Sequence, residues 1–188
     1  MSFELRPYQV AGADWLVARK HALLADEPGV GKTAQAIAAC DGVGAENVLV
    51  LCPASAKHQW RQRFDIVSVF GRQSQVLPNC QARPLPRGVV IASYDLAIRK
   101  PLAGRLLSRE WDVVIADESH YCASRKAKRS RYLWAGLTSK AARVWCLTGT
   151  PAPNHVGETW AMLNAFGWYK GGHPVRLREH PVQGQKRK

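Results

Sequence analysis

The chain has 188 residues, 46% of them hydrophobic and 22% charged, and its 27 lysines and arginines against 14 acidic residues give a formal net charge of +13. Such a chain is long enough to bury a real core as one domain, and its composition excludes a largely disordered protein. It has no apolar run near the ~20 residues that span a bilayer and no signal-peptide pattern at MSFELRPYQ, so we expect an intracellular protein without membrane contact.

The placement of the charges indicates which class of partner the protein binds, and the cysteines indicate whether its compartment is reducing. Five cations and no acid lie in SRKAKRSR at residues 124–131, and the chain ends in QKRK. Such clusters attract polyanions and speed association with them. We therefore favour the explanation that the positive charge binds nucleic acid over the explanation that it only keeps the protein soluble. The five cysteines are odd in number and show no C-x-x-C spacing, so we expect reduced structural thiols.

In chain order, short apolar runs alternate with segments that have the pattern of helices. A helix is expected over residues 7–19, with Pro7 in its first turn, before the apolar run ALLA at 22–25. The later runs are NVLVLC (47–52), GVVIAS (88–93), WDVVIAD (111–117) and RVWCLTG (143–149), and the later helices are expected over 34–40, 54–64, 96–107, 132–140 and 157–166. Runs that are apolar on consecutive residues are typical of strands buried on both faces. The pattern predicts an α/β fold with a doubly wound, mainly parallel sheet, followed by a basic Gly- and Pro-containing tail at 167–188.

The stretch LLADEPGVGKTAQAI, at residues 23–37, has the features of a strand, a phosphate-binding loop and a helix. It departs from the G-x-x-x-x-G-K-[ST] pattern because Asp26 stands where the first glycine is expected. Gly29 and Gly31 still permit positive φ and close approach of backbone N–H groups to phosphate oxygens. Lys32 would bridge the terminal phosphates and Thr33 would bind Mg²⁺. We therefore predict a nucleotide site here rather than a plain strand–turn–helix.

An acidic pair, Asp117 and Glu118, ends a later apolar run in WDVVIADESH. A carboxylate at this place can hold Mg²⁺ and a neighbouring glutamate can polarise the attacking water, although acids also decorate ordinary helix N-termini. The presence of Lys32 and Thr33 in the same chain favours catalysis. For His120 we favour a contact between the nucleotide site and neighbouring motifs over a core or capping role.

The ordered motifs LRPYQ, ADEPGVGKT, LCPASAKHQW, ASYD, DESH and LTGTP resemble those of SWI/SNF-type ATPases of helicase superfamily 2, in particular the bacterial, phage and fork-remodelling branch. The resemblance implies a three-layer RecA-like P-loop domain, the N-terminal lobe of such a motor, over residues 1–166. Residues 167–188 would be a tail or a truncated linker. A P-loop kinase is disfavoured by LTGTP.

The resemblance also implies roles for individual residues. Gln9, with Arg6, would recognise adenine, and Thr33 and Asp117 would bind the metal. The catalytic set would be Lys32, Asp117 and Glu118. The full set of expected nucleotide contacts is Arg6, Gln9, Asp26, Glu27, Pro28, Gly29, Val30, Gly31, Lys32 and Thr33. The residues expected to couple nucleotide state to DNA are His120, Thr148, Gly149 and Thr150.

Two groups of residues are expected at the nucleic-acid backbone. The first comprises Pro53, Ala54, Ser55, Ser93 and Tyr94, whose sequences also suit ordinary turns and N-caps. The second comprises the basic residues Arg125, Lys126, Lys128 and Arg129, which could equally form a solvated face. For Trp60 and Trp111 core packing is favoured over base stacking.

A complete motor of this family has two RecA-like lobes, and the resemblance covers one. The expected function is therefore the ATP-binding lobe of a DNA-dependent ATPase or translocase that uses ATP and Mg²⁺, contacts duplex DNA and takes a second lobe from a separate chain for efficient hydrolysis. As an isolated lobe it would be a weak enzyme. The alternatives are a non-catalytic DNA-binding or interaction module and a degenerate remnant. The cytoplasm of a bacterial or phage-infected cell is expected, or the nucleus if the source is eukaryotic.

Overall fold

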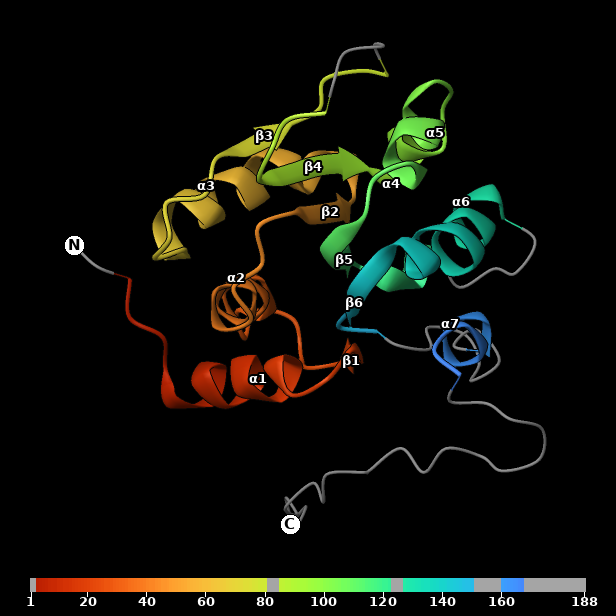
Figure 1. The fold of residues 1–188 in the computed structure, drawn as a ribbon. Helices are drawn as coiled ribbons and strands as arrows, with labels where there is room; N and C mark the ends of the chain where they lie inside the picture. The colour runs from red at the N-terminus through yellow and green to blue at the C-terminus, as the bar shows by residue number, and fades with distance from the viewer. Residues whose placement is uncertain (1–2, 81–84, 123–126, 151–159, 168–188) are drawn as a thin grey trace.

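The computed structural model describes residues 3–80, 85–122, 127–150 and 160–167. Its centre is a six-stranded sheet in the order β1-β6-β5-β2-β4-β3, in which every described pair of neighbours is parallel (Figure 1). The strands are β1 (His21–Leu24), β2 (Val48–Cys52), β3 (Ser74–Val76), β4 (Val89–Ser93), β5 (Trp111–Asp117) and β6 (Ala141–Leu147). The tail at 167–188, apart from its first residue, and the expected DNA contacts Arg125 and Lys126 lie outside the described residues.

The helices cover both faces of the sheet, as Figure 1 shows. They are α1 (Pro7–Val17), α2 (Lys32–Gly42), α3 (Lys57–Val67), α4 (Tyr94–Ala97), α5 (Leu102–Leu107), α6 (Lys128–Arg131) and α7 (Trp160–Ala165), with a 3-10 turn η1 (Ala54–Ala56) before α3 and another, η2 (Ser119–Cys122), after β5. One apolar core lies between the sheet and α1 to α3, and a second lies between the sheet and α4, α5 and α7. No described helix is long and apolar enough to cross a membrane.

Strand β2 shows how the two cores arise from the sequence. All five of its residues are buried, because alternate side chains enter opposite cores: Val48 and Val50 lie in the first, Leu49 and Leu51 in the second. This confirms the doubly wound parallel fold expected from the continuous apolar runs. The structure also buries the indoles of Trp60 and Trp111, with 1% and 2% of their surface exposed.

Three elements differ from the sequence expectations. The edge strand β3 was not predicted, because it is short and polar and pairs along three residues with β4 alone. The expected helix at 96–107 is divided into α4 and α5 at Pro101, which lacks the N–H that an uninterrupted helix needs. The expected helix at 132–140 is a π turn over Tyr132–Gly136 followed by a 3-10 turn over Leu137–Lys140. Of the helix expected at 157–166, residues 157–159 lie outside the described part.

Candidate nucleotide site

The loop between β1 and α2 has the backbone of a phosphate cradle. Gly29 and Gly31 both lie in the left-handed region, with φ of 87° and 82°, and Gly31 is the N-cap of α2. The Lys32 ammonium donates hydrogen bonds to the carbonyl oxygens of Asp26 (2.8 Å) and Glu27 (2.9 Å), so the lysine closes over its own loop. Asp26, which replaces the usual first glycine, contributes its backbone carbonyl to this contact.

Gln9 ties the start of α1 to the same loop. Its amide nitrogen donates to the Val30 carbonyl (3.1 Å), and its amide oxygen accepts from the backbone N–H of Arg6 (3.0 Å). A Cβ on Gly31 would lie 2.2 Å from that amide nitrogen, so a side chain here would have to displace the Gln9 amide. The structure therefore places Gln9, expected at the adenine, directly beside the phosphate loop.

Asp117 ends β5 in a network of three donors. Its Oδ2 accepts from the Trp60 indole N–H (2.7 Å), its Oδ1 accepts from the backbone N–H of Glu118 (3.1 Å), and its carbonyl accepts from the Tyr94 hydroxyl (2.7 Å). Burial raises the pKa of the Asp117 carboxyl; the Trp60 hydrogen bond and the Lys32 charge lower it, and the Glu118 charge raises it. A desolvated carboxylate of this kind is stabilised by a bound cation.

Glu118 adopts a left-handed backbone, with φ of 49°, which is costly for a residue with a side chain and is found mainly where a site requires it. Its carboxylate lies 3.2 Å from His120 Nδ1. The same ring nitrogen lies 3.2 Å from the Thr148 hydroxyl and 3.4 Å from the Thr150 hydroxyl. His120 thus brings the acidic pair and the 148–150 segment together, which is the geometry expected for a linking residue.

The 148–150 segment also packs on the phosphate loop. The backbone N–H of Thr148 donates to the Leu24 carbonyl at the end of β1 (3.1 Å). A Cβ on Gly149 would lie 2.8 Å from Pro28 Cγ, so this glycine lets the two loops meet. The loop residues, the acidic pair and the TGT segment, which are far apart in sequence, are therefore contiguous at the carboxyl edge of the sheet.

The residues expected at nucleic acid fall into different environments. After β2, Ala54 and Ser55 are exposed and Pro53 is half-buried, so this segment can reach a ligand. At the end of β4, Ser93 is buried and its hydroxyl accepts from the backbone N–H of Leu96 as the N-cap of α4.

Tyr94 is 3% exposed, and its hydroxyl donates to the Asp117 carbonyl. The Ser93 side chain is therefore a helix cap and the Tyr94 side chain lies in the core. The expectation that these two residues face the nucleic-acid backbone from the end of their strand stays a prediction.

The described part of the basic stretch lies near these segments. Lys128 is exposed, whereas Arg129 is half-buried. The Arg129 guanidinium donates to the Tyr121 carbonyl (2.5 Å), lies 5.6 Å from the centre of the Tyr121 ring and lies 3.7 Å from the Asp95 carboxylate. Its charge is thus partly compensated within the domain, and Lys128 is the more accessible cation.

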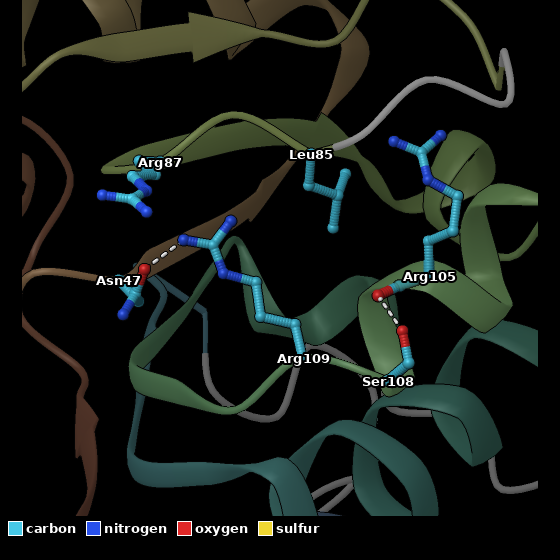
Figure 2. Close-up of a pocket in the computed structure, with 6 residues that line it drawn as sticks. All are labelled: Asn47, Leu85, Arg87, Arg105, Ser108 and Arg109. Carbon is cyan, nitrogen blue, oxygen red and sulfur yellow. Dashed lines mark hydrogen bonds between the residues drawn. The ribbon is translucent and has the colours of Figure 1, made fainter.

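A hollow of about 480 Å³ lies at the opposite, amino edge of the sheet (Figure 2). It is lined by Asn47, Leu85, Arg87, Arg105, Ser108 and Arg109. The Arg109 guanidinium donates to the Pro86 carbonyl (2.6 Å) and to the Asn47 side chain, and it stacks 4.5 Å from the centre of the Trp111 ring. The residues that line this amino-edge hollow come just before β2, β4 and β5 in the chain. The hollow is therefore remote from the phosphate loop, which follows β1, and the sequence did not predict it.

A parallel sheet with a glycine loop after its first strand and a carboxylate at the end of β5 defines a RecA-like P-loop NTPase domain. The profile of the SNF2-related domain family matches residues 8–169, so the chain belongs to that family. This confirms the resemblance drawn from the motifs.

Curated relatives and solved structures agree with this assignment. The chain is 32% identical over 179 residues to the ISWI chromatin-remodeling complex ATPase ISW1 of Saccharomyces cerevisiae, covering 86% of this chain and 15% of that protein. It is 34% identical over 171 residues to the human DNA annealing helicase and endonuclease ZRANB3, with 87% and 16% covered. It is 32% identical over 183 residues to the uncharacterized ATP-dependent helicase YqhH of Bacillus subtilis, with 92% and 30% covered.

The fold matches the Sulfolobus solfataricus SWI2/SNF2 ATPase core in complex with dsDNA with a TM-score of 0.76 at 23% identity, covering 88% of this chain and 36% of that one. The chain thus spans only a small part of its curated relatives and about a third of this core.

Proposed function

We propose that this chain is the ATP-binding lobe of a DNA-dependent ATPase or translocase, completed by a second RecA-like lobe. The observation that carries the proposal is the contiguity of the phosphate loop, the acidic pair and the 148–150 segment in a chain of the SNF2-related family. The DNA-bound form of the Sulfolobus core and the net charge of +13 support duplex DNA as the partner.

The residues present fit a nucleotide with Mg²⁺. Gly31 has the positive φ of the loop, Lys32 supplies a charge-assisted donor for phosphate oxygens, and Thr33 lies in the first turn of α2, whose positive dipole end favours an anion. Thr33 and Asp117 would hold the metal together with phosphate oxygens. When bound, Mg²⁺ neutralises charge that develops on the phosphates.

Glu118 is the residue that would orient and deprotonate the attacking water. Its left-handed backbone aims the side chain to the same side as His120 and the 148–150 segment. Through this cluster the position of the 148–150 segment would depend on whether Glu118 faces a nucleotide. The second lobe would add an arginine finger, worth ~10³–10⁵ in rate in related phosphoryl transfer, so the single lobe would hydrolyse ATP slowly.

The test is equilibrium binding of a fluorescent ATP analogue with Mg²⁺ to the wild type, Lys32→Ala and the control Lys140→Ala, which removes a partly exposed lysine paired with Glu110. Loss of one charge-assisted hydrogen bond corresponds to about 10- to 100-fold weaker binding for Lys32→Ala. The control should bind as the wild type does, and circular dichroism should show all three folded. Equal affinities for all three proteins would refute the assignment of the loop.

Hydrolysis is tested with Glu118→Gln, with and without duplex DNA. The amide fills the same space without accepting a proton, so this variant should retain nucleotide affinity while hydrolysis falls by about 10²–10⁴. A DNA-binding module without catalysis, the alternative favoured by the charge alone, would bind duplex DNA equally well in the wild type, Lys32→Ala and Glu118→Gln and would show no DNA-stimulated hydrolysis.

A further inference from the structure

Asp117, whose carboxylate is expected to bind metal, accepts hydrogen bonds from side chains of two other elements. Trp60 of α3 donates its indole N–H to Asp117 Oδ2 at 2.7 Å, and Tyr94 of α4 donates its hydroxyl to the Asp117 carbonyl at 2.7 Å. These elements follow β2 and β4, and β2 lies beside β5 in the sheet. The carboxyl ends of the three strands therefore meet at this residue.

The burial of both donors makes these contacts specific. Trp60 is 1% exposed and Tyr94 is 3% exposed, so neither donor has bulk water as an alternative partner. A buried donor without an acceptor is costly, and a donor to a carboxylate forms one of the stronger hydrogen bonds in a protein. Each of the two carboxylate oxygens of Asp117 accepts one hydrogen bond from the protein and keeps a lone pair for a further ligand. The carboxylate is thus oriented without being saturated.

The same two donors stand next to segments that reach the surface. Helix α3 follows η1 directly, and η1 carries the exposed Ala54 and Ser55. Tyr94 begins α4, whose Asp95 faces Arg129 of the basic stretch at 3.7 Å. A displacement of either segment by a ligand would move a donor of Asp117.

We infer that Trp60 and Tyr94 are positioning residues that orient Asp117 for its metal and transmit contact at the η1 and α4 segments to it. This inference rests on the proposed function, because it concerns the metal and DNA of that same site. By linkage, DNA bound at these segments and metal–nucleotide bound at Asp117 must change each other's affinity by the same factor. Trp60 supplies the larger share, because its bond is to the carboxylate, whereas that of Tyr94 is to the backbone.

The competing explanation is that both residues only fill the core, since the Trp60 ring also lies 6.1 Å from that of Phe64. The chain offers a matched control for each substitution. Trp111 is 2% exposed and donates its indole N–H to the Leu106 carbonyl at 2.9 Å, at the beginning of β5 and remote from the site. Tyr132 donates its hydroxyl to the Ala103 carbonyl at 2.9 Å.

The experiment compares Trp60→Phe with Trp111→Phe, and Tyr94→Phe with Tyr132→Phe. Each substitution removes one donor and keeps a ring. The first readout is Mn²⁺ affinity in the complex with a non-hydrolysable ATP analogue, measured by electron paramagnetic resonance, with analogue affinity in EDTA as the reference. Loss of a partner that orients a metal ligand typically weakens metal affinity about 10- to 100-fold, so Trp60→Phe should lose about tenfold or more while binding in EDTA is unchanged. Tyr94→Phe should lose less Mn²⁺ affinity than Trp60→Phe does. The two controls, Trp111→Phe and Tyr132→Phe, should keep the Mn²⁺ affinity of the wild type.

The second readout is the ratio of duplex-DNA affinities with and without the metal–nucleotide complex. In the wild type this ratio should differ from one, and in Trp60→Phe it should approach one. Retained Mn²⁺ affinity and a wild-type ratio in Trp60→Phe would overturn the inference while leaving the proposed function intact. A wild type whose ratio is one would overturn the coupling. A wild type that binds the analogue neither with Mn²⁺ nor in EDTA would overturn the proposed function itself.

Discussion

Alanine at two glycines of the phosphate loop should separate backbone strain from a steric contact. Gly29 and Gly31 have nearly the same φ, 87° and 82°. A Cβ at Gly29 would have nothing within 4 Å, whereas a Cβ at Gly31 would lie 2.2 Å from the Gln9 amide nitrogen. Both substitutions therefore impose the left-handed backbone on a residue with a side chain, and one of them also displaces Gln9.

The structure sets the size of the two effects. The left-handed backbone costs about 1–2 kcal/mol for a residue with a Cβ, which is the whole expected loss for Gly29→Ala. Gln9 makes two hydrogen bonds, to the Val30 carbonyl and from the Arg6 N–H. At about 0.5–1.5 kcal/mol each, their loss brings the expected cost of Gly31→Ala to about 2–5 kcal/mol. For a chain of this size each kcal/mol lowers Tm by about 2–4 °C.

The assay is urea unfolding of both single variants, of Gln9→Ala, and of Gly31→Ala combined with Gln9→Ala. With the Gln9 side chain shortened, Gly31→Ala should cost no more than Gly29→Ala does in the wild type, because the clash is gone. Equal losses for the two glycine variants, or an unchanged cost of Gly31→Ala in the Gln9→Ala background, would contradict the docking of Gln9 on the loop.

Two further predictions concern the surface charges and the thiols. Replacing both Lys128 and Arg129 by alanine should flatten the log–log salt dependence of duplex binding by up to about 1.8, at ~0.9 per neutralised phosphate. Replacing Arg87 and Arg105 in the amino-edge hollow removes the same charge and should leave the slope unchanged; equal flattening by both pairs would mean that net charge, not position, governs binding. Four of the five thiols are buried and burial raises the pKa of each, so native protein titrated with a disulfide reagent should show one fast thiol, Cys80, and all five only after denaturation. Two or more fast thiols would show that the core is more open than described.

The fold could be predicted where the sequence carries a strong local signal. The five apolar runs became strands because residues buried on both faces must be apolar at consecutive positions, as in β2. The edge strand β3 carried no such signal, since SQV is exposed or half-buried throughout. The division of the 96–107 helix does have a local signal, because Pro101 lacks the N–H of a helix interior. Ser93 is a residue type that suits an N-cap, and in the structure it is the N-cap of α4.

The candidate site could be predicted as a set of motifs but not as a network. Gly31, Lys32 and the acidic pair are recognisable because phosphate and metal chemistry restricts residue type and spacing. The bond from Trp60 to Asp117 depends on β2 being the neighbour of β5, and strand order is not encoded in any local pattern. For the same reason the meeting of Gly149 with Pro28 could not be anticipated, since it requires β6 to lie beside β1.

The position of β1 has a consequence for how the protein is made. In the described part of the chain this strand pairs only with β6, the last strand in sequence, and His21 lies opposite Val144, a separation of 123 residues (144 minus 21). Contacts between such distant segments form late, because a long loop must close before they are gained. During synthesis the phosphate loop would leave the ribosome early, but β1, the strand before it, would have no neighbour to pair with until β6 had also emerged. We therefore expect nascent chains that end before residue 141 to lack nucleotide binding, and competence to appear abruptly once residue 147 has left the exit tunnel.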